Sequence, residues 1–138
     1  MAETLILDSE AINSLAHARA RGTLADRARA ILTVAFEHGA LVRVPAPVLA
    51  EVCRSPRFDA AIHHVLNARG IGVVALTRSI AERAGHLLAR LKLSSAHSVD
   101  AFVVATAAEC GNAVIATSDP VDIRRLAAPF RHIRVLAL

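Results

Sequence analysis

The sequence predicts a three-layer α/β/α domain with a mostly parallel, five-stranded central sheet. Five short apolar segments alternate along the chain with longer segments of helical periodicity, and buried parallel strands are typically apolar throughout. The chain has 138 residues, of which 54% are hydrophobic and 20% are charged. This is enough to bury the core of one ordinary domain. We therefore expect a single domain over residues 1–138.

The expected strands are short and end at turn-forming or polar residues. The second ends where Pro45 and Pro47 follow it, and the fourth changes from apolar to polar at Thr117. Runs of four to eight apolar residues bounded in this way are typical of strands in a buried sheet. The five segments are residues 4–7, 41–44, 72–76, 113–116 and 133–136.

The expected helices carry apolar residues at a helical period and have recognisable ends. Gly39 suits the position after a helix, and Pro47 suits the first turn of one. Ser79 and Glu82 match a capping box, in which the two residues cap the helix start reciprocally. Gly111 stops a nearly all-apolar helix. The helical segments are residues 9–20, 24–35, 47–53, 58–68, 79–91 and 98–110, and a segment that begins at about residue 121.

Composition excludes several classes of protein. The longest uncharged apolar run, residues 101–108, is far shorter than the roughly 20 residues that a membrane-spanning helix needs. Glu3 stands where a signal peptide would carry positive charge, so we expect a cytoplasmic protein. Cys53 and Cys110 have neither the number nor the spacing of a disulfide framework or zinc site, and we expect two reduced thiols.

The basic residues permit a nucleic-acid partner. The net charge is +4, and fifteen Arg stand against the single Lys92; arginine suits phosphate recognition. Because the chain has no Trp or Tyr, recognition by base stacking is disfavoured, and contacts to a nucleic-acid backbone are favoured. The candidates for these contacts lie close in sequence to acidic residues, although as surface charges they need no function: Arg54, Arg57, Arg124 and Arg125.

Four acidic residues stand where a parallel α/β sheet places ligands, outside the carboxyl ends of its strands. Asp8 follows the first strand and Asp119 follows the fourth. Glu51 lies in the short helix after the second strand, and Asp100 lies in the first turn of the apolar helix before the fourth. We expect these four carboxylates to converge at one end of the sheet.

Each acid also has a simpler interpretation. Asp8 and Asp119 could merely cap the helices that follow them, with Asp122 three residues after the second. Glu51 alone could be a solvated helix residue. Asp100 is the only charge in its helix before Glu109, and the helix dipole, worth about 0.3 to 1 kcal/mol, does not explain a charge in an apolar segment.

Convergence of these carboxylates would be costly without a cation. Two like charges 4 Å apart repel by about 4 kcal/mol at an effective dielectric constant near 20, so their pKa values must rise or a cation must lie among them. An all-oxygen site suits Mg²⁺ or Mn²⁺. Such an ion activates water and stabilises charge on phosphate oxygens. The chemistry that fits is phosphodiester hydrolysis.

Four motifs occur in order on these elements: "LILDSEAI", "VPAPVLAEVCR", "HSVDAFVVATAAECG" and "VIATSDPVDI". Over nearly the whole chain this arrangement resembles the PIN-domain ribonucleases, most closely the VapC-type toxins of bacterial toxin–antitoxin pairs. The resemblance implies a PIN-like fold and a metal-dependent endoribonuclease that cuts single-stranded or looped RNA. It also implies a homodimer and a small antitoxin that blocks the acidic pocket.

The resemblance also implies roles for individual residues. The catalytic and metal-binding acids are those matching Asp8, Glu51, Asp100 and Asp119, which bind Mg²⁺ or Mn²⁺. The hydroxyl matching Thr117 and the acid matching Asp122 support them. Many relatives have a small residue after the first Asp and then Ser or Asn, whereas here Ser9 is followed by Glu10, which either joins the site or faces solvent.

Other interpretations remain. A haloacid-dehalogenase or response-receiver type of aspartate-based phosphohydrolase also has Asp after its first strand. The first type needs an Asp where this chain has Glu10, the second needs an Asp after the third strand, where "GVVALTR" has none, and Lys92 does not match the late active-site Lys of either type. A non-catalytic PIN-like scaffold that binds RNA or protein would keep the same acids. The seven histidines are scattered without a shared face and predict no metal site; His97 lies closest to the expected pocket.

Overall fold

A fully parallel sheet of five strands forms the centre of the computed structural model, which describes residues 3–138. The strand order is β3-β2-β1-β4-β5, and every neighbouring pair is parallel. This confirms the predicted fold class. The strands are β1 (Thr4–Leu7), β2 (Leu41–Pro45), β3 (Ile71–Val74), β4 (Ala113–Thr117) and β5 (Ile133–Ala137).

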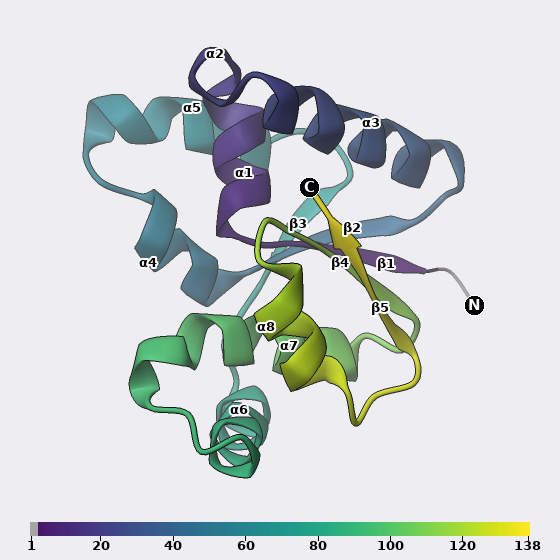
Figure 1. Cartoon of the computed structure of the whole chain (residues 1–138). Coiled ribbons are helices and arrows are strands. Elements are labelled where there is room, and N and C mark those ends of the chain that lie inside the picture. Colours follow the sequence, from purple (N-terminus) through teal and green to yellow (C-terminus); the bar gives the residue numbers. More distant parts are fainter. Residues whose placement is uncertain (1–2) are drawn as a thin grey trace.

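Helices cover both faces of the sheet (Figure 1). One face carries α1 (Ser9–Ala16), α2 (Ala18–Arg21), α3 (Thr23–Glu37) and α5 (Pro56–Leu66), and the other carries α6 (Arg78–Arg90), α7 (Ser98–Glu109) and α8 (Pro120–Ala127). After β2 come a 3₁₀ turn (Ala46–Val48) and the short helix α4 (Leu49–Val52), and a second 3₁₀ turn (Ser95–His97) precedes α7. The layers result from parallel crossovers, which return each strand through a helix on one face or the other.

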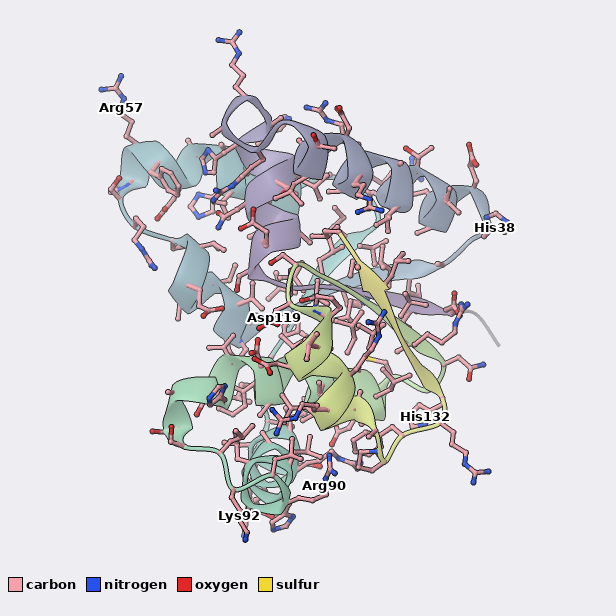
Figure 2. All side chains as sticks on the ribbon, viewed as in Figure 1. His38, Arg57, Arg90, Lys92, Asp119 and His132 are labelled. Atoms are coloured by element: carbon pink, nitrogen blue, oxygen red, sulfur yellow. The ribbon has the colours of Figure 1, made fainter. Side chains whose placement is uncertain are left out.

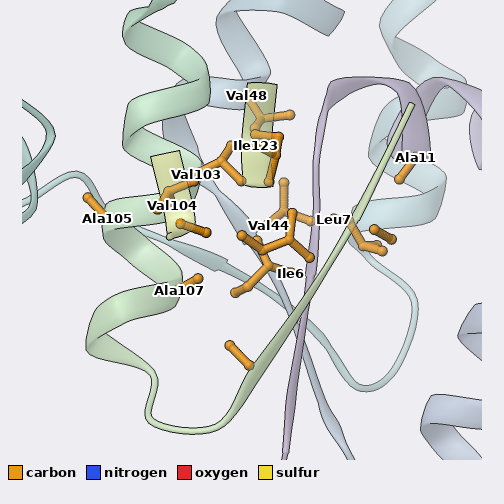
Figure 3. Close-up of a cluster of buried hydrophobic side chains, with 14 of the residues drawn as sticks. Ile6, Leu7, Ala11, Val44, Val48, Val103, Val104, Ala105, Ala107 and Ile123 are labelled. Carbon is orange, nitrogen blue, oxygen red and sulfur yellow. The ribbon is translucent and has the colours of Figure 1, made fainter. Parts of the chain in front are cut away.

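The core lies between β1, β2, β4 and helix α7 (Figure 3). Ile6, Val44 and Ile115 are fully buried in the strands. Helix α7 is buried on nearly all sides, because it packs against the sheet, α6 and α8. This explains its all-apolar sequence and makes Asp100, in its first turn, a charge held at the edge of the core.

The predicted helix over residues 9–20 is interrupted at His17. The backbone of His17 (φ −119°, ψ 53°) is not helical, and the chain resumes as the single-turn helix α2. The His17 ring stacks on Phe58 of α5, with ring centroids 4.1 Å apart. Because this partner comes from a distant part of the chain, the apolar stripe of residues 9–20 could not reveal the break.

The predicted capping box of Ser79 and Glu82 is wrong. Helix α6 begins two residues earlier than that motif requires, and the hydroxyl of Thr77 caps it by accepting a hydrogen bond from the Ile80 amide at 3.2 Å. Glu82 instead pairs with Arg78 at 2.7 Å. Thr77 is itself a preferred capping residue, and its earlier position determines where the helix starts.

The other helix boundaries agree with the sequence to within a few residues. Gly39 follows His38, the C-cap of α3, and has φ 70°, which is the left-handed conformation that favours glycine after a helix. Helix α5 begins at Pro56, where Ser55 caps it, rather than at Phe58. Within residues 3–138, no helix is both long and apolar enough to cross a bilayer.

Candidate metal centre

The candidate site lies at the carboxyl ends of β1 and β4, which are adjacent in the sheet. The chain proceeds from β1 to β2 on one side, whereas β4 and β5 lie on the other, so the strand order reverses between β1 and β4. Ligands of open parallel sheets bind at such a point. Asp8 directly follows β1, and Asp119 lies two residues beyond β4 (Figure 2).

Asp8 is the N-cap of α1 and is also a buried charge. Its Oδ1 accepts a hydrogen bond from the Ala11 amide at 3.0 Å, and the residue is only 8% exposed. Burial, and to a smaller extent the charge of Glu10, raises the pKa of Asp8, while hydrogen bonds from the Thr117 hydroxyl and from the Ala11 and Ser118 amides oppose the rise. The capping hydrogen bond therefore involves one oxygen of the Asp8 carboxylate. The carboxylate also interacts with Thr117, the last residue of β4.

Asp119 occupies the N-cap position of α8 but makes no side-chain capping hydrogen bond. Its backbone amide instead donates to the Thr117 hydroxyl at 2.9 Å, and its side chain is exposed at the carboxyl end of the sheet. Helix capping thus fails to explain this acid. Its carboxylate is free to serve a ligand.

Thr117 connects the two acids. It is fully buried at the end of β4, and its hydroxyl accepts a hydrogen bond from the Asp119 amide while hydrogen-bonding to the Asp8 carboxylate. One hydroxyl can act as donor and acceptor at the same time. Thr117 therefore fixes the relative positions of Asp8 and Asp119.

We expect Thr117→Val to weaken this connection without changing side-chain volume. Loss of the buried hydroxyl leaves the Asp119 amide without its partner, which costs about 1 to 2 kcal/mol, and misplaces both carboxylates. A denaturant titration measures the stability loss, and metal affinity is expected to fall about tenfold.

Thr106→Val is the matched control for this substitution. The Thr106 hydroxyl is also buried and donates to the Phe102 carbonyl oxygen at 2.7 Å within α7. Both variants should lose comparable stability, and only Thr117→Val should lose metal affinity. Equal metal affinity in the two variants would contradict the role assigned to Thr117.

Asp100 is the acid on which the charges of the other acids act most clearly. Its pKa is raised from 3.8 to about 6, first by burial and then by the negative charges of Asp119, Glu51, Asp8 and Asp122. All these contributions favour the protonated form of the carboxyl group. The charges of the other acids thus act on Asp100, and a site that binds a cation would have this property.

Glu51 reaches the site from α4 and is exposed. The Ser9 hydroxyl donates a hydrogen bond to its Oε1, so the first turn of α1 orients this carboxylate. Sequence reasoning gave Ser9 no role. The signal for one was its position between Asp8 and Glu10, at the start of a helix beneath the expected site.

Glu10 is engaged elsewhere. Its Oε1 lies 3.2 Å from Nε of Arg21 and accepts a hydrogen bond from the Ser14 hydroxyl at 3.4 Å. Glu10 therefore faces along α1 toward α2 and acts on Asp8 through its charge. The sequence left open whether Glu10 joins the site or faces solvent. Neither interpretation describes Glu10 fully, because its carboxylate forms an ion pair with Arg21.

The four arginines proposed for RNA contacts lie in different surroundings. Arg124 and Arg125 are exposed on α8, and Nη1 of Arg125 lies 3.7 Å from the Asp122 carboxylate. Arg54 donates through Nη1 to the carbonyl oxygens of Ala50 and Cys53 at the end of α4. Arg57 lies in the first turn of α5 and points outward, away from Asp119 (Figure 2). The α8 arginines are therefore the best placed.

A histidine joins the acidic cluster. One donor atom from each of His97, Asp100 and Asp122 lies within 4.8 Å of the others, where α7 and α8 begin. The sequence places His97 near the expected pocket, but the scattered histidines do not predict that it belongs to the site. The spacing of three residues between His97 and Asp100 was the available signal, since such a spacing at a helix start brings side chains together.

The donor set fits a hard divalent cation. Asp8, Glu51, Asp100 and Asp119 supply carboxylate oxygens only, which Mg²⁺ and Mn²⁺ prefer. A bound cation would also relieve the repulsion that raises the Asp100 pKa. The chemistry of these four residues therefore suits such an ion. In residues 3–138, however, the group of three or more donor atoms that already lie within 4.8 Å of one another consists of His97, Asp100 and Asp122.

Fold and site together define a parallel α/β protein with a candidate acidic metal centre at its topological switch point. The chain belongs to the PIN domain family, whose model matches residues 5–129. A similar solved structure is that of VapBC2 from Rickettsia felis bound to a DNA fragment from their promoter, with a TM-score of 0.67 at 11% identity over 98% of both chains. No curated protein matches the sequence.

Proposed function

We propose that this protein is a metal-dependent endoribonuclease and the toxin component of a type II toxin–antitoxin system. The observation that carries the proposal is the raised pKa of Asp100, to which burial and then the charges of Asp119, Glu51 and Asp8 contribute, at the switch point of the sheet. Membership of the PIN domain family supports a nuclease. The similar fold of VapBC2 from Rickettsia felis supports the toxin–antitoxin context.

In this proposal the chain's own residues hold and orient the reacting groups. A bound Mg²⁺ or Mn²⁺ supplies an activated water and stabilises negative charge on the scissile phosphate. Asp8, Asp119, Glu51 and Asp100 would hold this ion, and Thr117 would position the first two of these carboxylates. The rigid strand ends provide the positional accuracy that such a site needs.

The RNA backbone would approach across α8. Arg124 and Arg125 are exposed on this helix, whose first turn begins next to Asp119. Their charges would hold phosphates near the acidic site, where the carboxylates alone would repel them. With no Trp or Tyr in the chain, contacts to phosphates rather than stacking on bases would supply most of the affinity.

The partners are part of the same proposal. A small cognate antitoxin would block the acidic pocket, and the toxin would act as a cytoplasmic homodimer. The antitoxin is supported by the family resemblance and by the VapBC2 structure, whereas the homodimer rests on the family resemblance alone. An antitoxin-like reading frame beside the gene would favour the toxin over a PIN-like scaffold without activity.

The first test is cleavage of a mixed pool of structured and single-stranded RNA with Mg²⁺, Mn²⁺ or EDTA. We expect metal-dependent cleavage by the wild-type protein and at least about a 100-fold loss in Asp8→Asn. Asparagine is a good N-cap, so this variant keeps the bond to the Ala11 amide and is expected to fold.

Asp26→Asn is the matched control for this test, because Asp26 is an exposed acid on α3 that pairs only weakly with Arg29, at 3.8 Å. It should cleave like the wild-type protein. Cleavage that persists in EDTA or in Asp8→Asn would identify a contaminating nuclease. Binding of Mn²⁺ without cleavage of any RNA in the pool would favour the non-catalytic scaffold instead.

A further inference from the structure

A mixed nitrogen and oxygen cluster adjoins the four carboxylates. His97 ends the 3₁₀ turn that leads into α7, Asp100 lies in the first turn of α7, and Asp122 lies in the first turn of α8. Their donor atoms lie within 4.8 Å of one another, although Asp122 is more than 20 residues from the other two in sequence. The packing of α7 against α8 creates this cluster.

We propose that His97, Asp100 and Asp122 bind a divalent transition-metal ion, so that the imidazole gives this site a preference for Mn²⁺ over Mg²⁺. The inference rests on the proposed function, because Asp100 also belongs to the four-carboxylate set. It adds a nitrogen ligand and a metal preference, neither of which the acidic residues alone provide.

The separation of the three donors suits one ion. Opposite ligands of an octahedral ion with bonds of about 2.1 Å are about 4.2 Å apart. Adjacent ligands of such an ion are about 3.0 Å apart, so the donors of His97, Asp100 and Asp122, within 4.8 Å of one another, must approach by at most about 2 Å to share one ion. All three residues are half-buried, so small side-chain rotations are available while the backbone stays in place.

The alternative role for His97, helix capping, does not account for its side chain. His97 occupies the N-cap position of α7 but makes no side-chain capping hydrogen bond there. Histidine is also less suited to that position than Ser, Thr, Asp or Asn. Its imidazole is therefore available as a ligand.

The chemistry of the donors determines which ions are favoured. Imidazole binds Mn²⁺ and the later transition metals better than it binds Mg²⁺, which retains oxygen ligands and water. Two carboxylates balance the charge of a divalent ion. The nearby cation Arg125, 3.7 Å from Asp122 and about half exposed, can turn into solvent when the ion binds.

The test is electron spin-echo spectroscopy of the Mn²⁺-loaded protein, which detects a nitrogen nucleus bound to the ion. We expect ¹⁴N coupling in the wild-type protein and its loss in His97→Asn. Asparagine at an N-cap is favourable, so this variant should fold, and a thermal melt without metal checks that it does. His64→Asn, on the exposed surface of α5, is the matched control and should keep the coupling.

Competition between the two ions supplies a second measurement. The ratio of Mn²⁺ to Mg²⁺ affinity should fall about tenfold or more in His97→Asn and stay unchanged in His64→Asn. Asp122→Asn should weaken Mn²⁺ binding but retain the ¹⁴N coupling of the ion that still binds, because His97 remains.

The outcomes separate this inference from the proposed function. Mn²⁺ bound to the wild-type protein without ¹⁴N coupling, or coupling that survives in His97→Asn, would overturn the role of His97 and leave a carboxylate-only nuclease site. Failure of the wild-type protein to bind Mn²⁺ at all would overturn the metal site of the proposed function together with this inference.

Discussion

Asp100→Asn is expected to lose RNA cleavage by at least about 100-fold and, at the same time, to stabilise the metal-free protein. The carboxylate is needed to hold the ion, but without the ion it is repelled by Asp119, Glu51, Asp8 and Asp122. Removing its charge at pH 7 should raise the free energy of unfolding by roughly 1 to 2 kcal/mol, after allowance for solvent screening of a half-buried group.

Two measurements on one preparation check this prediction: the rate of RNA cleavage with Mn²⁺ and the thermal midpoint in EDTA. Asp26→Asn removes an exposed acid far from the site and should change neither by much. An Asp100→Asn protein that unfolds more easily than the wild type in EDTA would mean that the carboxylate has a structural role. Retained cleavage would remove Asp100 from the catalytic set.

Metal binding is expected to raise the melting temperature strongly, and more at pH 7.5 than at pH 5. An ion at 100 times its dissociation constant stabilises the folded state by about 2.7 kcal/mol, which corresponds to roughly 8 °C for a domain of this size. Protons compete with the ion for the carboxylates at low pH. The increase on adding Mn²⁺ should therefore be smaller at pH 5.

The metal-free protein has its own pH dependence, and its sign follows from Asp100. The pKa of this group is about 6 in the folded protein against 3.8 ordinarily, so between these values the folded state binds a proton that the unfolded state has lost. The free energy of unfolding then falls as pH rises through this window. Above about pH 6 the whole destabilising effect of the charged Asp100 carboxylate is present.

Thermal melts in EDTA from pH 4 to pH 8 measure this contribution as the difference between wild type and Asp100→Asn. The difference should be small near pH 4 and grow to its maximum above pH 6. A difference that is the same at every pH would show that repulsion of the Asp100 carboxylate does not affect stability.

Much of the fold could be predicted because its signals are local. Strands buried on both faces must be apolar, and β1 and β4 could therefore be located from composition alone. The all-apolar helix α7 could be located in the same way. The break at His17 and the cap at Thr77 could not, because the first involves Phe58 of a distant helix and the second depends on which of two hydroxyls begins the helix.

The candidate site was likewise predictable only in part. The rule that parallel sheets bind ligands at their carboxyl ends was enough to group Asp8, Asp119 and Asp100. It could not show that Glu10 is engaged by Arg21 or that Ser9 orients Glu51. These are contacts between side chains of different helices, and their geometry depends on how the helices pack.

The fold class, the order of the elements and the four candidate acids could all be predicted from the amino-acid sequence, because these depend on apolar composition and position along the chain. What those acids contact depends instead on how the helices and strands pack. This packing connected Asp8 to Asp119 through Thr117 and brought Asp122 to His97 across two helix starts. Donor atoms a few ångströms apart result from packing, and no spacing in the sequence specifies them.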